Sequence, residues 1–266
     1  SMSKIIAIWG NPGSGKTTFS CLLAKRLTRD KSKAIIVSPD SATPILPVLF
    51  PNENIEKSMS LGNVLSAVEM DNALVASKVV LYKPYPFVGV MGYSAGETPL
   101  SYPDTDYAKV LEFIDAAASL VDYLILDCTS SVVSAFTPAA LEAADTVIGI
   151  LSPNLFGIHY YRAHQPLLAD PRFKLDEQIA LAGKARPFQA IEEMGHLIGG
   201  FAGYLPYNKE IERSATCGEL FTILNNCGQK YTAALEMVVK AVSPEQPVVS
   251  KGKGKEGGKQ SDEQFE

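Results

Sequence analysis

The sequence has few residues of the kinds that bind metal ions or cross-link a chain. Its 266 residues include three histidines and four cysteines, and no two cysteines form a Cys-x-x-Cys pair. Cysteines this sparse do not make a disulfide framework. His159 and His164 lie five residues apart, so they do not share one helix face as a metal-binding pair would. We therefore expect a reduced, cytoplasmic protein without a transition-metal site.

A long hydrophobic run and an excess of basic charge are absent as well. No apolar stretch reaches the roughly 18 residues of a membrane-spanning helix, and no basic-then-apolar secretory leader opens the chain. The 24 Lys and Arg residues are outnumbered by 29 Asp and Glu residues, which gives a net charge of −5. This balance excludes a strongly basic nucleic-acid coat protein, and charge supports neither DNA nor membrane binding.

The sequence does contain short hydrophobic runs separated by helical patterns. Near-continuous apolar runs are typical of strands buried on both faces of a parallel sheet. We predict strands at residues 4–9, 33–38, 88–92, 122–127 and 146–151, with weaker candidates at 177–182 and 199–205. We predict helices at residues 17–27, 108–120 and 230–242. Repeated strand–helix units indicate an open α/β fold, a mostly parallel sheet with helices on both faces.

Composition divides the chain into one domain, residues 1–242, and a polar tail, residues 243–266. The tail is rich in Gly, Lys and Glu and poor in apolar residues, so we expect it to be disordered. Within the domain, residues 84–105 are rich in Pro, Gly, Tyr and Ser and are predicted to contain a long loop. Its aromatic residues either fold onto the sheet edge or form a protein-docking surface.

A phosphate-binding loop follows the first predicted strand. Residues 10–17 match the pattern G-x-x-x-x-G-K-[ST] in full, between a hydrophobic strand and an amphipathic helix. The glycines allow successive N–H groups to point inward as an anion-binding nest at the positive end of the helix. The alternative is a glycine-rich turn without a ligand, and the full match in this context favours nucleotide binding. The expected cofactor-binding residues here are Gly10, Asn11, Pro12, Gly13, Ser14, Gly15, Lys16, Thr17 and Thr18.

Three of these side chains have specific roles in such a site. Lys16 supplies a mobile positive charge for the β- and γ-phosphates. The Thr17 hydroxyl is a hard oxygen ligand that suits Mg²⁺. Thr18 can add a contact to the α-phosphate.

Two aspartates at strand ends are candidate catalytic residues and metal ligands. Asp127 ends the run Tyr-Leu-Ile-Leu-Asp, at the carboxyl end of a strand, where α/β sheets bind ligands. There it can orient Mg²⁺, and the alternative is a helix-capping or loop aspartate. Asp40 follows the strand at 33–38. If that strand neighbours the first one, Asp40 can reach the γ-phosphate and orient the attacking water or help to hold Mg²⁺; the alternative is a turn residue beside Pro39.

At these residues the chain resembles the MinD/ParA group of P-loop ATPases. The resemblance covers roughly residues 3–242 in motif order: the P-loop, Asp40, the strand that ends at residues 127–130, and the segment Gly-Tyr-Leu-Pro-Tyr-Asn at 203–208. That last segment is similar to the family's region beside the adenine. The resemblance therefore implies that Pro206 and Tyr207 contact the base.

The resemblance also implies a fold, ligands and an activity. The family has a seven- or eight-stranded, mostly parallel sheet, binds ATP with Mg²⁺, hydrolyses ATP slowly as a nucleotide switch, and often forms a dimer closed over two nucleotides. We accordingly assign catalytic roles to Lys16, Asp40 and Asp127, and metal binding to Thr17, Asp40 and Asp127. An unidentified protein partner and a role in positioning, partitioning, conjugation or pilus assembly belong to the same expectation.

The loop departs from the family at one residue, and other functions stay open. Where the family has a lysine that reaches across the dimer to the partner's phosphates, this chain has Asn11. An asparagine does not supply that charge, so we expect slow turnover without a partner. A small-molecule or nucleotide kinase is an alternative, because Gly-x-Pro-Gly-Ser-Gly-Lys also suits a kinase P-loop. A second alternative is an ATP-binding scaffold with little hydrolysis.

Overall fold

The hydrophobic runs form the strands of one sheet. The computed structural model describes residues 2–221 and 227–245, and in that part of the chain the sheet has eight strands in the order β3-β4-β2-β5-β1-β6-β7-β8. Neighbouring strands are parallel except β3, which runs antiparallel to β4. The strands are β1 (Lys4–Trp9), β2 (Ala34–Val37), β3 (Val80–Leu81), β4 (Val88–Met91), β5 (Tyr123–Asp127), β6 (Thr146–Leu151), β7 (Ile179–Ala185) and β8 (Gly203–Pro206).

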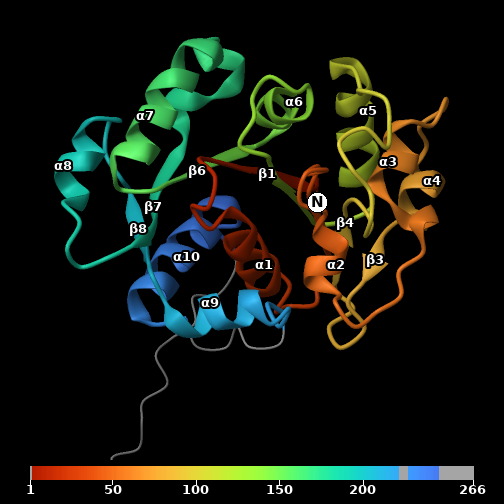
Figure 1. Ribbon diagram of the computed structural model, residues 1–266, viewed down its shortest axis with the longest axis horizontal. Helices are drawn as coiled ribbons and strands as arrows, with labels where there is room; N and C mark the ends of the chain where they lie inside the picture. Colours follow the sequence, from red (N-terminus) through yellow and green to blue (C-terminus); the bar gives the residue numbers. More distant parts are fainter. Residues whose placement is uncertain (1, 222–226, 246–266) are drawn as a thin grey trace, which may run out of the picture.

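Helices cover both faces of this sheet, as Figure 1 shows. On one face lie α1 and α10, and on the other lie α5, α6 and α7. The helices are α1 (Lys16–Leu27), α2 (Ile45–Leu49), α3 (Leu61–Leu65), α4 (Asn72–Ser77), α5 (Tyr107–Ala118), α6 (Phe136–Ala143), α7 (Leu155–His164), α8 (Ile191–His196), α9 (Lys209–Thr216) and α10 (Gln229–Val242). Short 3₁₀ turns occupy Lys57–Met59, Gln165–Leu168, Pro171–Phe173 and Leu175–Glu177.

The sheet separates two hydrophobic cores. Along the central strand β1, Ile6 and Ile8 pack into the core that includes α1 and α10, whereas Ala7 and Trp9 pack into the core that includes α5 and α6. Alternate residues of a strand point to opposite faces, so a strand buried on both faces needs apolar residues at every position. The near-continuous hydrophobic runs in the sequence have this cause.

A buried ion pair fixes α1 against α10 within the first core. Arg26 of α1 donates from Nε to Glu236 Oε1 at 2.5 Å and from Nη2 to Glu236 Oε2 at 2.8 Å. The Arg26 side chain is only 4% exposed. Such a forked pair adds geometric specificity to the apolar contacts between the two helices.

The parallel topology brings several loops to one edge of the sheet. The loops that follow β1, β2, β5, β6 and β7 all begin at the carboxyl ends of adjacent parallel strands. Open α/β sheets bind their ligands at this edge. Asp40 reaches the edge in a different way from the one expected, because β5 lies between β1 and β2, so the second strand does not neighbour the first.

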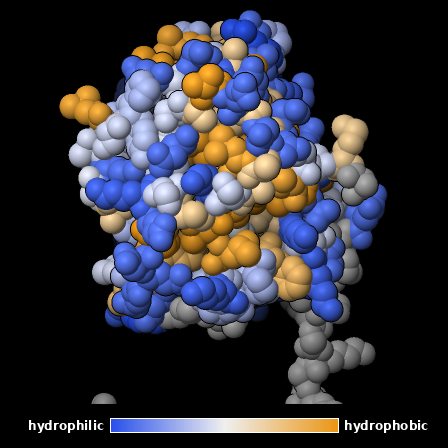
Figure 2. Space-filling view, turned by 90° about the vertical axis from the view of Figure 1, so that its right-hand side faces the viewer, coloured by the Kyte–Doolittle hydropathy of each residue, from blue (hydrophilic) through white to orange (hydrophobic). Residues whose placement is uncertain are grey.

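The sequence located the main strands but missed the irregular elements at the sheet margins. The strand expected at 177–182 lies at Ile179–Ala185, and the one expected at 199–205 lies at Gly203–Pro206. The two-residue edge strand β3 and the helices α2, α3, α4, α6, α7, α8 and α9 were not predicted. Figure 2 views the molecule from the side that carries β3 and α4, and hydrophobic residues gather in the middle of this face. Leu81 of β3 is hydrophobic and has 53% of its surface exposed.

The end of the domain agrees with the predicted last helix. The helix expected at 230–242 is α10, and it ends at Val242. Residues 246–266 of the predicted polar tail lie outside the described residues. Within the described residues, no helix combines the length and the apolar character needed to cross a bilayer.

Candidate nucleotide-binding site

The P-loop turns sharply between β1 and α1, and two glycines make that turn sterically feasible. Gly10 has a φ of +149°, and a Cβ atom there would lie 1.8 Å from the carbonyl oxygen of Ile150 on β6. Gly15, at the start of α1, has a φ of +100°. Side-chain-bearing residues rarely adopt either conformation. The turn aims the first N–H groups of α1, which have no carbonyl four residues earlier within the helix, at the space above the loop.

The Lys16 side chain is held by neutral oxygen atoms. Its Nζ donates to the carbonyl oxygens of Gly10 and Asn11, both at 3.1 Å, and to Ser130 Oγ at 2.9 Å. Burial lowers the pKa of Lys16, and the nearby charge of Asp127 opposes this shift. None of these three hydrogen-bond partners is an anion. The ammonium group is therefore available to a phosphate without having to break an ion pair.

Asp127 lies directly beneath the start of α1 and accepts two hydroxyl hydrogen bonds. Thr17 Oγ1 donates to Asp127 Oδ2 at 2.7 Å, and Ser20 Oγ donates to Oδ1 at 3.2 Å. Burial raises the pKa of Asp127 to about 6, although these hydrogen bonds and the charge of Lys16 favour the ionised form. The paired oxygens of Thr17 and Asp127 are of the hard type that Mg²⁺ prefers.

These groups open onto a cavity of about 390 Å³ above the loop. Asp40, Thr43 and Ser38 come to its wall from the loop after β2, and Asp127 from the end of β5. Asp40 also behaves as a turn residue, because its Oδ1 accepts the N–H groups of Ala42 at 2.9 Å and Thr43 at 2.8 Å. The structure thus shows Asp40 as a turn residue, and it also places Asp40 in the wall of the cavity. Predicted site residues that line this cavity are Pro12, Gly13, Gly15, Lys16, Thr17, Thr18, Asp40 and Asp127.

The side chain of Asn11, which was predicted as a cofactor-binding residue, is hydrogen-bonded to the end of β6. Asn11 is 5% exposed, and its amide pairs with the residue that follows β6. Its Oδ1 accepts the Ser152 N–H at 2.8 Å, and its Nδ2 donates to Ser152 Oγ at 3.0 Å. Buried polar side chains are nearly always hydrogen-bonded, and Asn11 finds its partners at Ser152. These hydrogen bonds connect the P-loop to the end of β6.

The residues expected to contact the base lie beside the P-loop in a much smaller cleft. Pro206 and Tyr207 line a space of about 20 Å³ together with Ser14 and Thr18. The guanidinium of Arg186 lies 3.9 Å from the centre of the Tyr207 ring and covers it.

Two residues between the cavity and the cleft were not predicted as site residues. Lys184 and Glu212 line both spaces, and their Nζ and Oε2 atoms lie 3.2 Å apart. Lys184 follows the strand pattern at 177–182, and Glu212 follows the Pro206 segment. The sequence therefore placed them near the site but gave no sign that they pair.

The loop after β5 connects the P-loop to α7. Ser130 accepts from Lys16 through its hydroxyl, and its carbonyl oxygen accepts a hydrogen bond from Tyr160 Oη at 2.7 Å. The Tyr160 ring stacks on His164, with 4.1 Å between the ring centres. Movement of Lys16 toward a ligand would thus break its hydrogen bond to Ser130, whose carbonyl oxygen is hydrogen-bonded to Tyr160 of α7.

Sequence comparison finds partial matches to one protein family and to two individual proteins. The family model of anion-transporting ATPases matches residues 3–85, which is less than half of the chain. An uncharacterized ATP-binding protein of Methanocaldococcus jannaschii is 27% identical over 150 residues, which are 56% of this chain and 52% of that protein. GPN-loop GTPase 1 of Dictyostelium discoideum is 28% identical over 167 residues, which are 62% of this chain and 36% of that protein. The matches thus span about half of the first relative and about a third of the second.

The fold gives a match over nearly the whole chain. The septum site-determining protein MinD of Pyrococcus horikoshii, in complex with Mg-ADP, superimposes with a TM-score of 0.70 and 16% identity, over 93% of this chain and 100% of that one. The chain has the MinD/ParA fold. The resemblance seen in the motifs and the expected mostly parallel sheet with helices on both faces are confirmed at the level of the fold. In the MinD/ParA fold of this chain, residues from the loops after β1, β2 and β5 meet around one cavity.

Proposed function

We propose that the chain binds ATP with Mg²⁺ in the P-loop cavity and hydrolyses it slowly as a nucleotide switch. The observation that carries the proposal is the pairing of Thr17 Oγ1 with Asp127 Oδ2 at 2.7 Å, beside Lys16 at the start of α1. A hydroxyl, a carboxylate and an ammonium group stand here together at the positive end of a helix. A polyphosphate bound to a hard divalent cation fits this set of groups best.

Each of these residues has a distinct role in the proposed reaction. Thr17 and Asp127 would hold Mg²⁺, with Asp40 as a further carboxylate on the cavity wall. Mg²⁺, when bound, supplies positive charge to the phosphate oxygens. Lys16 exchanges its neutral oxygen partners for phosphate oxygens and stabilises the charge that develops as the γ-phosphoryl group leaves. Asp40 orients the attacking water.

The charges around the cavity support slow turnover. Among the described residues that line it, only Lys16 and Lys184 are cationic, and Lys184 is paired with Glu212. Asn11 is neutral and its side chain is occupied by Ser152. In other P-loop enzymes an additional arginine supplied by a second protein raises the rate by about 10³–10⁵-fold. The isolated chain is therefore proposed to turn over slowly.

The proposed switch acts on a protein partner. Contacts from the γ-phosphate to Asp40 and to residues 127–131 would order the loops after β2 and β5 and so change the surface at this edge of the sheet. A role in positioning, partitioning, conjugation or pilus assembly rests on the resemblance to the MinD/ParA group. A cytoplasmic location and a homodimer belong to the same proposal, and the net charge of −5 gives no support for DNA or membrane binding.

Phosphate release from ATP tests the proposed activity. Purified protein is incubated with Mg·ATP, and inorganic phosphate is measured for the wild type, Lys16→Ala and Lys240→Ala. Lys240 is an exposed lysine on α10, so its removal controls for loss of a positive charge. We expect slow release that Lys16→Ala abolishes and Lys240→Ala leaves unchanged. Equal rates in all three proteins would contradict the proposal, and phosphate transfer to an added acceptor in excess of release to water would favour a kinase.

A further inference from the structure

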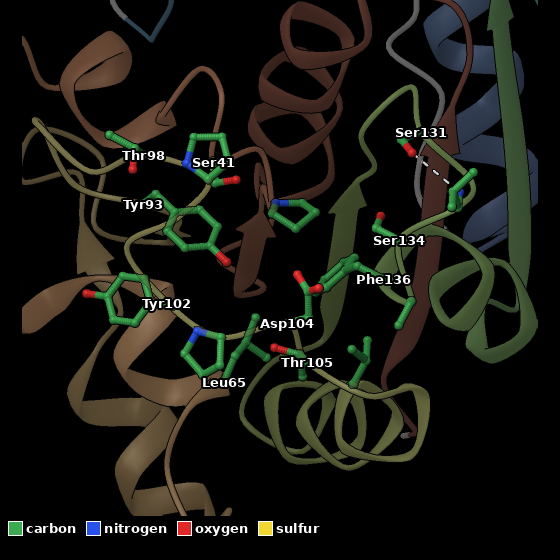
Figure 3. A pocket seen from close by; sticks show the side chains of 16 residues that line it. Ser41, Leu65, Tyr93, Thr98, Tyr102, Asp104, Thr105, Ser131, Ser134 and Phe136 are labelled. Carbon is green, nitrogen blue, oxygen red and sulfur yellow. Dashed lines mark hydrogen bonds between the residues drawn. The ribbon is translucent and has the colours of Figure 1, made fainter.

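A second cavity lies beside the P-loop cavity, at the same edge of the sheet (Figure 3). Its volume is about 510 Å³, and it is bounded by the loops that follow β2, β4 and β5 and by the start of α6. Cavities of roughly 300–1,000 Å³ are of the size that binds ligands or inserted side chains. The proposed ATP hydrolysis does not use this space.

The two cavities share their dividing walls. In the loop after β2, Asp40 faces the P-loop cavity, whereas its neighbour Ser41 lines the second cavity. In the loop after β5, Ser130 faces the P-loop cavity and Ser131 lines the second. The Ser131 hydroxyl accepts the N–H of Val133 at 3.3 Å, which shapes this part of the wall (Figure 3). The loops after β2 and β5 therefore form part of both cavities.

The chemistry of the second cavity favours a positively charged group. Of the described residues that line it, Asp104 alone carries a charge, and Asp104 is exposed. The rings of Tyr93 and Tyr102 also line it, with 5.9 Å between their centres. Glu97 accepts hydrogen bonds from the Tyr102 hydroxyl at 2.6 Å, the Ser60 hydroxyl at 2.6 Å and the Ser94 N–H at 2.8 Å, and so holds the Tyr102 ring in place. A carboxylate beside aromatic rings is a favourable environment for a guanidinium or an ammonium group.

The rim of the second cavity favours a polypeptide over a small cation. Val133 lines the cavity and is 88% exposed. Leu100, which follows the lining residues Thr98 and Pro99, is 93% exposed. A small cation bound at Asp104 would leave both side chains in water, whereas a polypeptide with apolar residues next to its basic one would cover them. Exposed apolar groups around a polar pocket are typical of protein-binding sites.

We propose that the second cavity binds an arginine or lysine side chain of a partner protein, whose neighbouring apolar residues cover Leu100 and Val133. This inference rests on the proposed switch function, because the loops that ATP would order are the dividing walls of the cavity. Partner binding and ATP binding are then coupled through Asp40–Ser41 and Ser130–Ser131. Such coupling is reciprocal, so each ligand changes the affinity for the other by the same factor.

A short peptide without nucleotide tests the cavity directly. Acetyl-Leu-Arg-Leu-amide is titrated into the full chain, and binding is followed by NMR shifts or calorimetry. The same peptide with citrulline in place of arginine keeps the shape and removes the charge. We expect saturable binding of the arginine peptide and binding of the citrulline peptide that is weaker by about fivefold or more.

Matched variants locate the binding. Asp104→Asn should weaken binding of the arginine peptide by a similar factor. Asp115→Asn, which removes a charge from an exposed position on α5, should leave the binding unchanged. Val133→Ser should weaken binding of the peptide but not binding of agmatine, a small guanidinium compound. If the arginine peptide does not saturate, or if the two aspartate variants bind it equally, the proposal is overturned. If agmatine binds as tightly as the peptide and Val133→Ser changes neither, the cavity is a site for small organic cations and the proposed partner is wrong.

A repeat with Mg·ATP separates this proposal from the proposed function. We expect the peptide affinity to change several-fold when ATP occupies the P-loop cavity. A chain that binds the peptide at Asp104 but does not bind ATP would refute the switch function and leave the second site in place. A chain that binds ATP but whose affinity for the peptide is unchanged by Asp104→Asn would refute the second site and leave the switch function in place.

Discussion

Acidification should weaken Mg·ATP binding through one buried carboxyl group. Burial raises the pKa of Asp127 to about 6 in the nucleotide-free protein. In the proposed site, only the ionised form of Asp127 would hold Mg²⁺ beside Thr17. At pH 5, one unit below this pKa, about one tenth of the Asp127 carboxyl groups are ionised, so the affinity contributed by Asp127 should fall about tenfold relative to pH 7.

The same shift has a defined effect on folding stability. The pKa of Asp127 is higher in the folded chain than the value of 3.8 for an unperturbed aspartate. Protonated Asp127 therefore stabilises the nucleotide-free fold fully below pH about 4, and this contribution is lost as the pH rises through about 6. Mg·ATP binding and the stability of the empty protein should respond to pH in opposite directions.

Calorimetric titration of Mg·ATP between pH 5 and pH 7.5 measures the effect. The terminal phosphate of the nucleotide itself titrates near pH 6, so the wild type alone does not isolate Asp127. The variant Asp127→Asn provides the correction, because it retains the nucleotide's titration and loses that of the residue. We expect a steeper pH dependence in the wild type. Parallel profiles for the two proteins would refute this role of Asp127.

Three further substitutions test the structural account. Gly10→Ala places a Cβ atom 1.8 Å from the Ile150 carbonyl oxygen, so it should lower the free energy of unfolding by about 3 kcal/mol or more in urea titrations. Arg26→Met leaves Glu236 without its forked partner and should cost about 3 kcal/mol in the same assay, and an unchanged midpoint would show that the ion pair contributes nothing. Asn11→Ala removes the hydrogen-bond partner of the Ser152 N–H and hydroxyl, so it should lower the free energy of unfolding by about 2 kcal/mol. Calorimetry should show this loss as a lower melting temperature. An unchanged melting temperature would mean that the stability of the fold does not depend on the Asn11–Ser152 hydrogen bonds.

The sequence was sufficient for the central strands and for the grouping of Lys16, Thr17 and Asp127 at one edge of the sheet. Strands such as β1 and β5 are buried on both faces, so their hydrophobic runs are continuous and easily recognised. Lys16, Thr17 and Asp127 come together because the P-loop pattern and the strand end are local signals that the parallel topology then places at one edge.

The remaining features depend on contacts between distant segments, which no local pattern reveals. β3 has two residues and exists through its pairing with β4. The side chain of Asn11 turns away from the cavity because Ser152, 141 residues later, offers it both a donor and an acceptor. The Lys184–Glu212 pair likewise joins the end of β7 to α9. Because the two residues lie in separate elements, no local sequence pattern predicts their contact.

Calorimetric titration with Mg·ATP and Mg·GTP at neutral pH tests the central claim most directly. The account predicts saturable binding of Mg·ATP that Lys16→Ala weakens strongly, that Lys240→Ala leaves unchanged, and that falls when EDTA removes the magnesium. Tight binding of ATP to Lys16→Ala, or no heat from either nucleotide with the wild-type protein, would contradict it.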